Sequence, residues 1–214
     1  MKKGFLSFLN SKVDKVKNAR IKRVLMIVEN HSYPYDTRVR LLSQSLKAAG
    51  FNISVICPRE NEQKKFEVVD GINVYRYPST RSGSGLVGFV WEFSYSTLMI
   101  FLYSIFIFFR EGFDIIHSNN PPDTIVFIGI FYKVLGKKVV YDEHDLSPEL
   151  YESRFGKRGG MVYKILCFLE KLSARSADLV ITVNESYQKI QIARTGIDPR
   201  KSVVIRNGPS PSRV

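Results

Sequence analysis

Short apolar runs and amphipathic segments alternate along most of the chain. Residues 23–29 form a run of apolar side chains bounded by charge, a pattern typical of a strand buried on both faces. Residues 38–49 then carry apolar side chains at helical spacing before a stop at Gly50, and residues 53–57 form a second apolar run. This strand, helix, strand order predicts a βαβ unit.

The alternation continues to the end of the chain. Residues 66–77 predict a β-hairpin that turns at Asp70-Gly71, and a Ser/Gly-rich stretch then leads into a long apolar helix. The remaining expected elements are strands over 113–117, 138–141, 179–183 and 202–206, and helices over 123–135, over 160–176 and from 186 onward. The sequence therefore predicts an α/β fold: a Rossmann-like, doubly wound, mostly parallel sheet with helices on both faces, in a domain of residues 22–208.

Residues 93–109 contain no charged side chain and are dense in Phe, Tyr, Ile and Leu. The segment reaches the lower edge of the roughly 17–25 residues that span a bilayer. Its Ser, Thr and Tyr content and the regular βα alternation around it favour a helix that is buried or dips into a membrane over one that spans it.

Positive charge is concentrated at the N-terminus. The net charge is +12, and residues 1–23 hold eight Lys or Arg against the single acid Asp14. Phe and Leu fall at helical spacing within residues 1–21, which predicts a basic amphipathic arm. We expect an anionic membrane surface as its partner and no nucleic acid, because nucleic acid does not need the apolar side; a solubilising tail is the alternative. Two distant cysteines fit a reducing cytosol.

Ligands of doubly wound sheets gather where the strands end, so the loops after the strands hold the candidate residues. Asp36, Thr37 and Arg38 lie where the first loop enters a helix, and Asn119 to Asp123 occupy the equivalent place after a later strand. Asp36 suits a helix cap, and the free N–H groups beside Arg38 suit a phosphate. Plain capping is an equal alternative for Asn119, Asn120 and Asp123.

The run from Asp142 to Asp145 is too polar to be explained by packing at a strand end. Because it contains one histidine and no second His or Cys lies at ligand spacing, we expect no metal site. We interpret His144 as a hydrogen-bonding or acid–base group that faces a cleft. The alternative is a loop whose carboxylates pair with Arg154, Lys157 and Arg158.

Gly83, Gly85 and Gly88 match the G-x-G-x-x-G pattern of dinucleotide sites. The first glycine does not follow a strand directly, and the next strand ends in His117-Ser118-Asn119 where such a site needs an acid. A loop is the better interpretation, and a nicotinamide-dependent dehydrogenase is the weakest of the functional hypotheses.

Several of these segments resemble family 4 glycosyltransferases of polysaccharide synthesis, which have the two-domain GT-B fold. The similar stretches run in order from residue 22 to the end: Tyr33 to Val39, Asn120 to Asp123, Tyr141 to Leu146, Ile181 to Glu185 and Val204 to Gly208. The resemblance implies retaining, metal-independent transfer from a nucleotide-sugar to an acceptor, often lipid-linked, at the cytoplasmic, inner face of the cell membrane. No cofactor is implied beyond that donor substrate.

The resemblance also assigns roles to the loops. It implies that Asp36, Thr37, Arg38, Asn119, Asn120 and Asp123 face the acceptor, that His144 and Asp145 act in catalysis, and that Glu185, Asn207 and Gly208 lie near a hinge. Members of the family continue into a donor-binding domain with a pair of glutamates eight positions apart, and no such pair occurs here. Residues 209–214 are therefore expected to begin an inter-domain linker, and a C-terminal domain or separate subunit to bind the donor. A non-catalytic, membrane-associated glycan-binding adaptor is the alternative.

Overall fold

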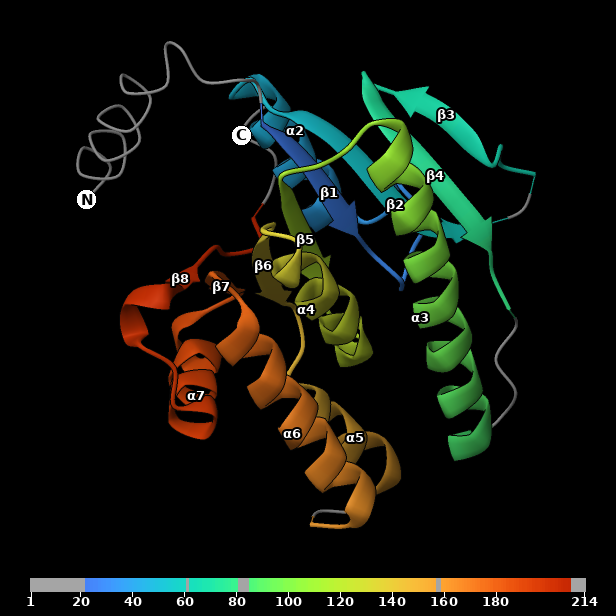
Figure 1. The fold of residues 1–214 in the computed structure, drawn as a ribbon. Helices are drawn as coiled ribbons and strands as arrows, with labels where there is room; N and C mark the ends of the chain where they lie inside the picture. Colours follow the sequence, from blue (N-terminus) through green and yellow to red (C-terminus); the bar gives the residue numbers. More distant parts are fainter. Residues whose placement is uncertain (1–21, 61, 81–84, 157–158, 209–214) are drawn as a thin grey trace.

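A computed structural model describes residues 22–60, 62–80, 85–156 and 159–208 (Figure 1). The predicted basic arm, residues 1–21, and the predicted start of a linker, residues 209–214, lie outside the described residues. The strands are β1 (Arg23–Ile27), β2 (Asn52–Arg59), β3 (Phe66–Val69), β4 (Ile72–Pro78), β5 (Ile115–Asn119), β6 (Lys138–Glu143), β7 (Leu179–Thr182) and β8 (Ser202–Val204). The helices are α2 (Thr37–Ala48), α3 (Gly85–Arg110), α4 (Val126–Val134), α5 (Ser147–Phe155), α6 (Met161–Ser176) and α7 (Glu185–Thr195), with 3-10 turns at Asp123–Ile125 and Pro199–Lys201.

The strands form one sheet in the order β3-β4-β2-β1-β5-β6-β7-β8. All neighbouring pairs are parallel except β3 and β4, which form the predicted antiparallel hairpin. Asp70 and Gly71 at its turn both have positive φ, as a two-residue hairpin turn of this kind requires. The order reverses between β1 and β5, which is where open α/β sheets bind their ligands.

Alternating side chains of the central strands pack on the two faces of the sheet. Met26 of β1 packs with Val39 of α2 on one face, whereas Leu25 and Ile27 pack with Ile107 of α3 on the other. Figure 1 shows α3, α4 and α6 on this second face. The predicted doubly wound, mostly parallel sheet is therefore confirmed.

Three local predictions differ from the structure. Helix α5 was not expected, because residues 142–149 resemble a polar loop; Pro148 in its first turn and Gly156 as a left-handed cap are the signals that mark it. Strand β6 runs on to Glu143, so Asp142 and Glu143 are strand residues. Helix α3 begins at Gly85, so the last two glycines of the dinucleotide-like pattern are helical.

The buried side of α3 predicts the effect of a core substitution. Ile107 is fully buried, so Ile107→Ala is expected to lower the free energy of unfolding by about 2–5 kcal/mol, through lost apolar contact and the cavity left behind. Phe109 on the same helix is 82% exposed, and Phe109→Ala should change stability by less than about 0.5 kcal/mol. Urea unfolding of both variants tests this, and equal losses would show that α3 does not pack as described.

Candidate functional site

A cavity of about 510 Å³ lies at the carboxyl edge of the sheet, between the start of α2 and the segments that follow β6 and β8. It collects predicted residues from three separate loops. Its lining comprises His31, Tyr35, Asp36, Thr37, Arg38, Leu41, Leu42, Ser45, His144, Ile205, Arg206, Asn207 and Gly208. Acceptor, catalytic and hinge candidates therefore share one wall of one cavity.

A cavity of comparable size, about 470 Å³, lies at the opposite edge, where β1 and β2 begin. Arg23, Asn52 and Glu111 are among its lining residues, and none of the predicted site residues reaches it. Because ligands of open α/β sheets bind at the carboxyl ends of the strands, we take the His144 cavity as the candidate site.

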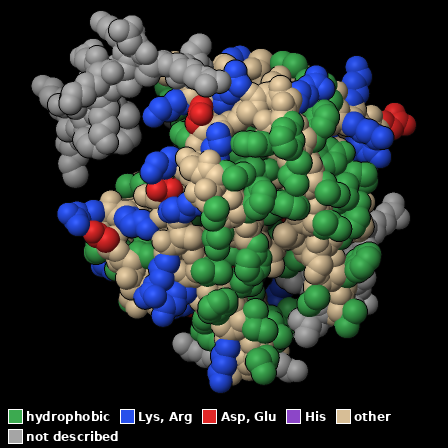
Figure 2. All heavy atoms as spheres, viewed as in Figure 1, with side chains coloured by type: hydrophobic (Ala, Val, Ile, Leu, Met, Phe, Trp, Pro, Cys, Tyr) green, Lys and Arg blue, Asp and Glu red, His purple; other side chains and the backbone are tan. Residues whose placement is uncertain are grey.

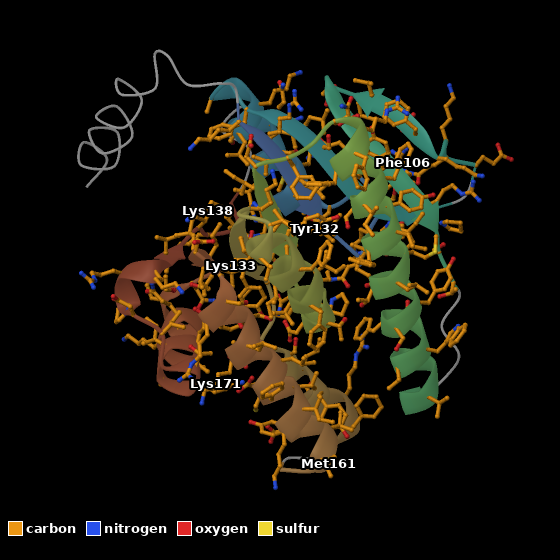
Figure 3. The ribbon with its side chains drawn as sticks, in the orientation of Figure 1. Phe106, Tyr132, Lys133, Lys138, Met161 and Lys171 are labelled. Atoms are coloured by element: carbon orange, nitrogen blue, oxygen red, sulfur yellow. The ribbon has the colours of Figure 1, made fainter. Side chains whose placement is uncertain are left out.

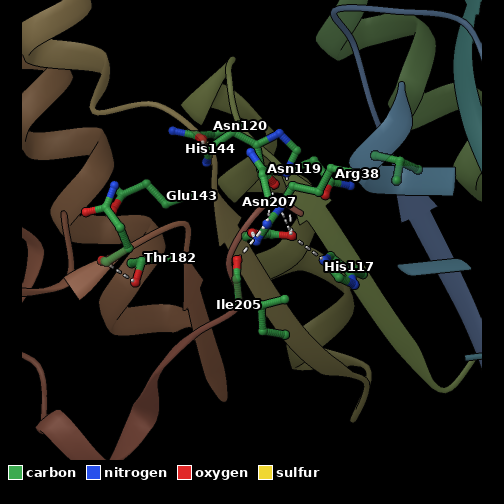
Figure 4. Close-up of polar contacts among 12 residues, drawn as sticks. Arg38, His117, Asn119, Asn120, Glu143, His144, Thr182, Ile205 and Asn207 are labelled. Atoms are coloured by element: carbon green, nitrogen blue, oxygen red, sulfur yellow. Dashed lines mark hydrogen bonds and ion pairs between the residues drawn. The ribbon is translucent and has the colours of Figure 1, made fainter. Parts of the chain in front are cut away.

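Arg38 holds the cavity wall together (Figure 4). It makes a bidentate ion pair with Asp142 of β6, with Nε 3.1 Å from Oδ2 and Nη2 2.7 Å from Oδ1. Its Nη1 also donates to the carbonyl of Ile205 at 2.7 Å and to Oδ1 of Asn207 at 2.8 Å. The guanidinium thus ties α2 to the centre of the sheet and to the segment after β8.

Asp142 is a fully buried carboxylate surrounded by cationic and imidazole groups. His117 Nε2 lies 3.4 Å and His144 Nε2 3.5 Å from its Oδ2, in addition to the Arg38 pair. Burial by itself would raise the pKa of Asp142, but the two imidazoles and Arg38 outweigh it and hold that pKa well below its usual range. Asp142 is therefore ionised across the physiological pH range.

His144 is placed at the cavity by its backbone. Its N–H donates to Oδ1 of Asn120 at 2.7 Å, and its side chain is 15% exposed beside Asp142. The N-cap prediction for Asp36 is confirmed, since its Oδ1 accepts from the N–H of Val39 at 2.9 Å. Thr37, Asn207 and Gly208 complete the predicted residues that line the cavity.

Asn119, Asn120 and Asp123 are buried behind the cavity wall. Asn119 donates to the carbonyl of Ile27 at 2.7 Å, and Asn120 donates to Asp123 at 3.1 Å and to the carbonyl of Asp145 at 2.8 Å. These contacts fix the turn after β6 to the end of β5. Their predicted contact with an acceptor stays a prediction, and the contacts described here position His144.

A buried acidic cluster lies beneath this turn. The hydroxyl of Tyr141 donates to Asp123 at 2.7 Å and lies 3.3 Å from Glu143, while Gln191 of α7 donates to Glu143 at 2.6 Å. Burial first, then the charges of Glu170 and Asp123, raises the pKa of Glu143 well above its usual range. Within the described ranges, no group of three or more His, Cys, Asp or Glu side chains is arranged to hold a metal ion.

Glu185 lies outside the cavity. It is the first residue of α7 and pairs with Arg206 at 2.6 Å, with both side chains more than half exposed. Arg206, which lines the cavity, connects it to the site, and the assignment of Glu185 to a hinge stays a prediction.

Sequence reasoning missed His31, Tyr35, His117 and Asp142. Asp142 gives a usable signal, because a carboxylate directly after an apolar run at a strand end needs a partner. His117 has the same signal as a polar residue inside a buried strand. Nothing in the sequence pairs Asp142 with Arg38, which is distant along the chain.

Three comparisons relate the chain to known proteins. Residues 36–213 match the family described as Glycosyltransferase Family 4. The chain is 24% identical over 161 residues to the chitobiosyldiphosphodolichol beta-mannosyltransferase of Debaryomyces hansenii; the match covers 72% of this chain and 34% of that protein. The chain therefore spans about a third of the length of this relative.

Solved structures share the fold at low identity. The chain is similar to a sucrose-phosphate synthase structure from Thermosynechococcus elongatus, with a TM-score of 0.61, 15% identity and coverage of 87% of this chain and 90% of that one. It is also similar to the Phytolacca americana UGT2 complexed with UDP-2-fluoroglucose and pterostilbene, with a TM-score of 0.55 and 11% identity. This match covers 89% of this chain and 54% of the UGT2 chain. The chain is similar as well to the UDP-N-acetylglucosamine 2-epimerase of Methanocaldococcus jannaschii, with a TM-score of 0.51 and 14% identity. That match covers 86% of this chain and 45% of the epimerase chain.

The buried ion pair predicts the behaviour of Asp142→Asn. Removing the carboxylate leaves the Arg38 guanidinium buried without its counter-charge, so we expect unfolding to become easier by about 3–5 kcal/mol. The matched control is Asp198→Asn, which removes an exposed pair with Arg200 and should cost at most about 1 kcal/mol.

The same variant has a predicted pH dependence. Because folding lowers the pKa of Asp142, its contribution is complete above the unfolded-state pKa of about 3.9 and is lost as the pH falls below it. Urea titrations should therefore show a constant difference between wild type and Asp142→Asn from neutral pH down to about pH 5, and a smaller one below about pH 4. A difference that grows on acidification would contradict this assignment.

Proposed function

The chain belongs to glycosyltransferase family 4, and we propose that it supplies the acceptor-binding half of a retaining, nucleotide-sugar-dependent glycosyltransferase. It is a glycosyltransferase-type domain with the GT-B fold. The observation that carries the proposal is the cavity at the carboxyl edge, whose lining includes His144, Asp36, Thr37 and Asn207. We propose polysaccharide or glycolipid synthesis as its setting.

The lining of the cavity suits a saccharide. Tyr35 presents a ring that is 66% exposed, and Thr37 and Ser45 contribute hydroxyl groups. Sugar hydroxyls both donate and accept hydrogen bonds, as do these groups and the Asn207 amide. His144 adds a polar ring whose backbone is fixed by Asn120.

The proposed roles follow from which groups are free. Each of the three guanidinium nitrogens of Arg38 already donates to Asp142, Ile205 or Asn207, so we assign Arg38 to positioning. The start of α2 presents the positive end of a helix dipole at the same wall, which favours an anionic group such as a phosphate of either substrate. His144 is proposed to hydrogen-bond the transferred sugar, with Asp142 orienting the ring from 3.5 Å.

The proposed donor site lies on a second domain. Sugar transfer requires the donor phosphates and sugar to be fixed beside the acceptor hydroxyl. The relative matched by this chain is named for a diphosphodolichol-linked acceptor and is about three times as long as the matched segment. We propose that a second Rossmann-like domain, in the same polypeptide or in a separate subunit, holds the nucleotide-sugar opposite the His144 cavity.

Sugar transfer is the direct test of this proposal. Labelled UDP- and GDP-sugars are incubated with a membrane lipid extract as acceptor, either with the chain alone or with the assembly that it forms in its own cells. We expect transfer by the assembly and none by the chain alone. Robust transfer by the isolated chain would contradict the half-site proposal, and no transfer by either would favour a glycan-binding adaptor.

His144→Ala in the active assembly tests the proposed site. Loss of a group that contacts the reacting sugar should lower kcat by about 10²–10³-fold with little change in the unfolding midpoint. Ser153→Ala, on the exposed side of α5, is the control and should retain full activity. Unchanged kcat in the His144 variant would remove His144 from the reaction.

A further inference from the structure

Three neighbouring helices expose apolar side chains on the same side of the molecule. We define the apolar face as the outward sides of residues 98–109 in α3, 127–135 in and after α4, and 161–168 in α6. We propose that this face is a membrane-docking surface that inserts into the interface of an anionic lipid bilayer. The proposal concerns where the protein binds and not what it catalyses, so it stands or falls independently of sugar transfer.

Each helix is apolar on its outer side as well as its inner side. On α3, Ile100 and Ile107 are buried against the sheet, while Leu98, Leu102 and Phe106 are at least half exposed on the other side. Residues 98, 102 and 106 are spaced four apart, so their side chains form one stripe along the helix. Helix α3 is thus apolar on two sides, one packed in the core and one exposed in the part of the chain that the structure describes.

The other two helices extend the stripe into a surface. Val134 at the end of α4 is 83% exposed and Met161 at the start of α6 is 77% exposed. Phe131 of α4 contacts Phe101 of α3, with ring centroids 5.3 Å apart, and α4 also packs on α6. Figure 2 shows the result as a broad tract of hydrophobic side chains in the middle of this view. Soluble proteins rarely expose an apolar tract of this extent without a binding partner.

Positive charge borders the apolar face. Lys133, Lys138 and Lys171 lie along its α4 and α6 side, between Phe106 at one end and Met161 at the other (Figure 3). Residues 126–138 contain no acid, and the one acid of α6, Glu170, is fully buried. Asp178 pairs with Lys133 and Lys138 at this border.

Cationic side chains also lie over the aromatic rings of this face. Lys137 Nζ is 5.3 Å from the centre of the Phe108 ring, and Arg110 Cζ is 5.6 Å from that of Phe106. At a membrane interface, Lys and Arg side chains pack their aliphatic stems on apolar surface and keep their charged groups at the polar edge. Protein interfaces are poor in lysine, so this border favours anionic lipid over a protein partner.

The geometry favours docking over spanning. Val90–Arg110 is long and apolar enough to cross a bilayer by length and composition. Its inner side, however, packs on the sheet through Ile100, Ser104 and Ile107, so the helix lies along the domain surface. The His144 cavity is lined from α2, on the other face of the sheet, and a docked protein leaves it open.

Vesicle binding by the full chain tests the proposal. The probes are vesicles of phosphatidylcholine alone and of phosphatidylcholine with about one-third phosphatidylglycerol, because anionic headgroups attract the lysines. We expect binding to the anionic vesicles, with a blue shift in the fluorescence of Trp91, the one tryptophan of the chain, which is exposed on α3. The basic residues of the N-terminal segment remain in every variant, so that a difference reports the apolar face.

The informative variant is the triple substitution Phe109→Ser, Val134→Ser and Phe168→Ser. All three side chains are exposed, so the fold should survive, while binding to anionic vesicles should weaken by at least about tenfold. The control pair Val68→Ser and Ile190→Ser removes exposed apolar groups outside the face and should bind as the wild type does. Lys171→Gln should weaken binding to anionic vesicles by about fivefold.

Three results would overturn the proposal. Binding of the triple variant equal to that of the wild type would show that the face does not touch lipid, as would a wild type that binds no vesicle. A wild type that elutes as a dimer, together with a triple variant that elutes as a monomer and retains its vesicle binding, would identify a second copy of the chain as the occupant.

Discussion

The ion pair between Arg38 and Asp142 is the interaction on which the candidate site depends. It joins the first turn of α2 to the middle of the sheet and, through Ile205 and Asn207, to the segment that follows β8. Both partners are almost fully buried, so neither can lose the other without leaving a charge in a low-dielectric environment. Three segments distant in sequence are thereby held at one edge of the sheet.

The neighbouring polar groups form a support for His144. The Asn120 side chain both donates to and accepts from the backbone of the turn after β6. Beneath this turn, Tyr141 and Glu143 form a buried hydrogen-bonded cluster in which the pKa of the Glu143 carboxyl is raised. Side chains that look like ligand contacts in the sequence thus act here as a frame for the side chains that line the cavity. A site placed on such a frame keeps its geometry when substrates arrive, which is a general requirement for orientation effects in catalysis.

The two faces of the sheet have different uses. The face with α2 carries the cavity wall, whereas the face with α3, α4 and α6 carries a large exposed apolar surface bordered by lysine. A transferase with these two surfaces could act on an acceptor held at a membrane while its cavity stays accessible to a donor from the aqueous side. This combination joins the proposed function to the proposed docking surface, although each rests on separate residues.

The sequence by itself determined the layers of the fold. Apolar runs such as residues 23–29 and amphipathic segments such as 38–49 predicted the parallel sheet and its helices. A strand buried on both faces is apolar throughout, whereas a helix buried on one side has apolar residues at helical spacing. The cap at Asp36 and the turn at Asp70-Gly71 were predictable for the same reason, since both depend on local backbone geometry. Helix α5 was missed because polar residues masked its Pro148 and Gly156 signals.

Only the tertiary structure decided which residues meet. The pairing of Arg38 with Asp142, the burial of Asn120 and the exposure of Phe109 depend on where distant segments pack. A run of apolar residues has the same sequence pattern whether its outer side is buried in a core or exposed. The sequence therefore predicted an apolar helix at residues 93–109 and left its surroundings undetermined. Local periodicity fixes what each element is, and long-range packing fixes what each side chain touches.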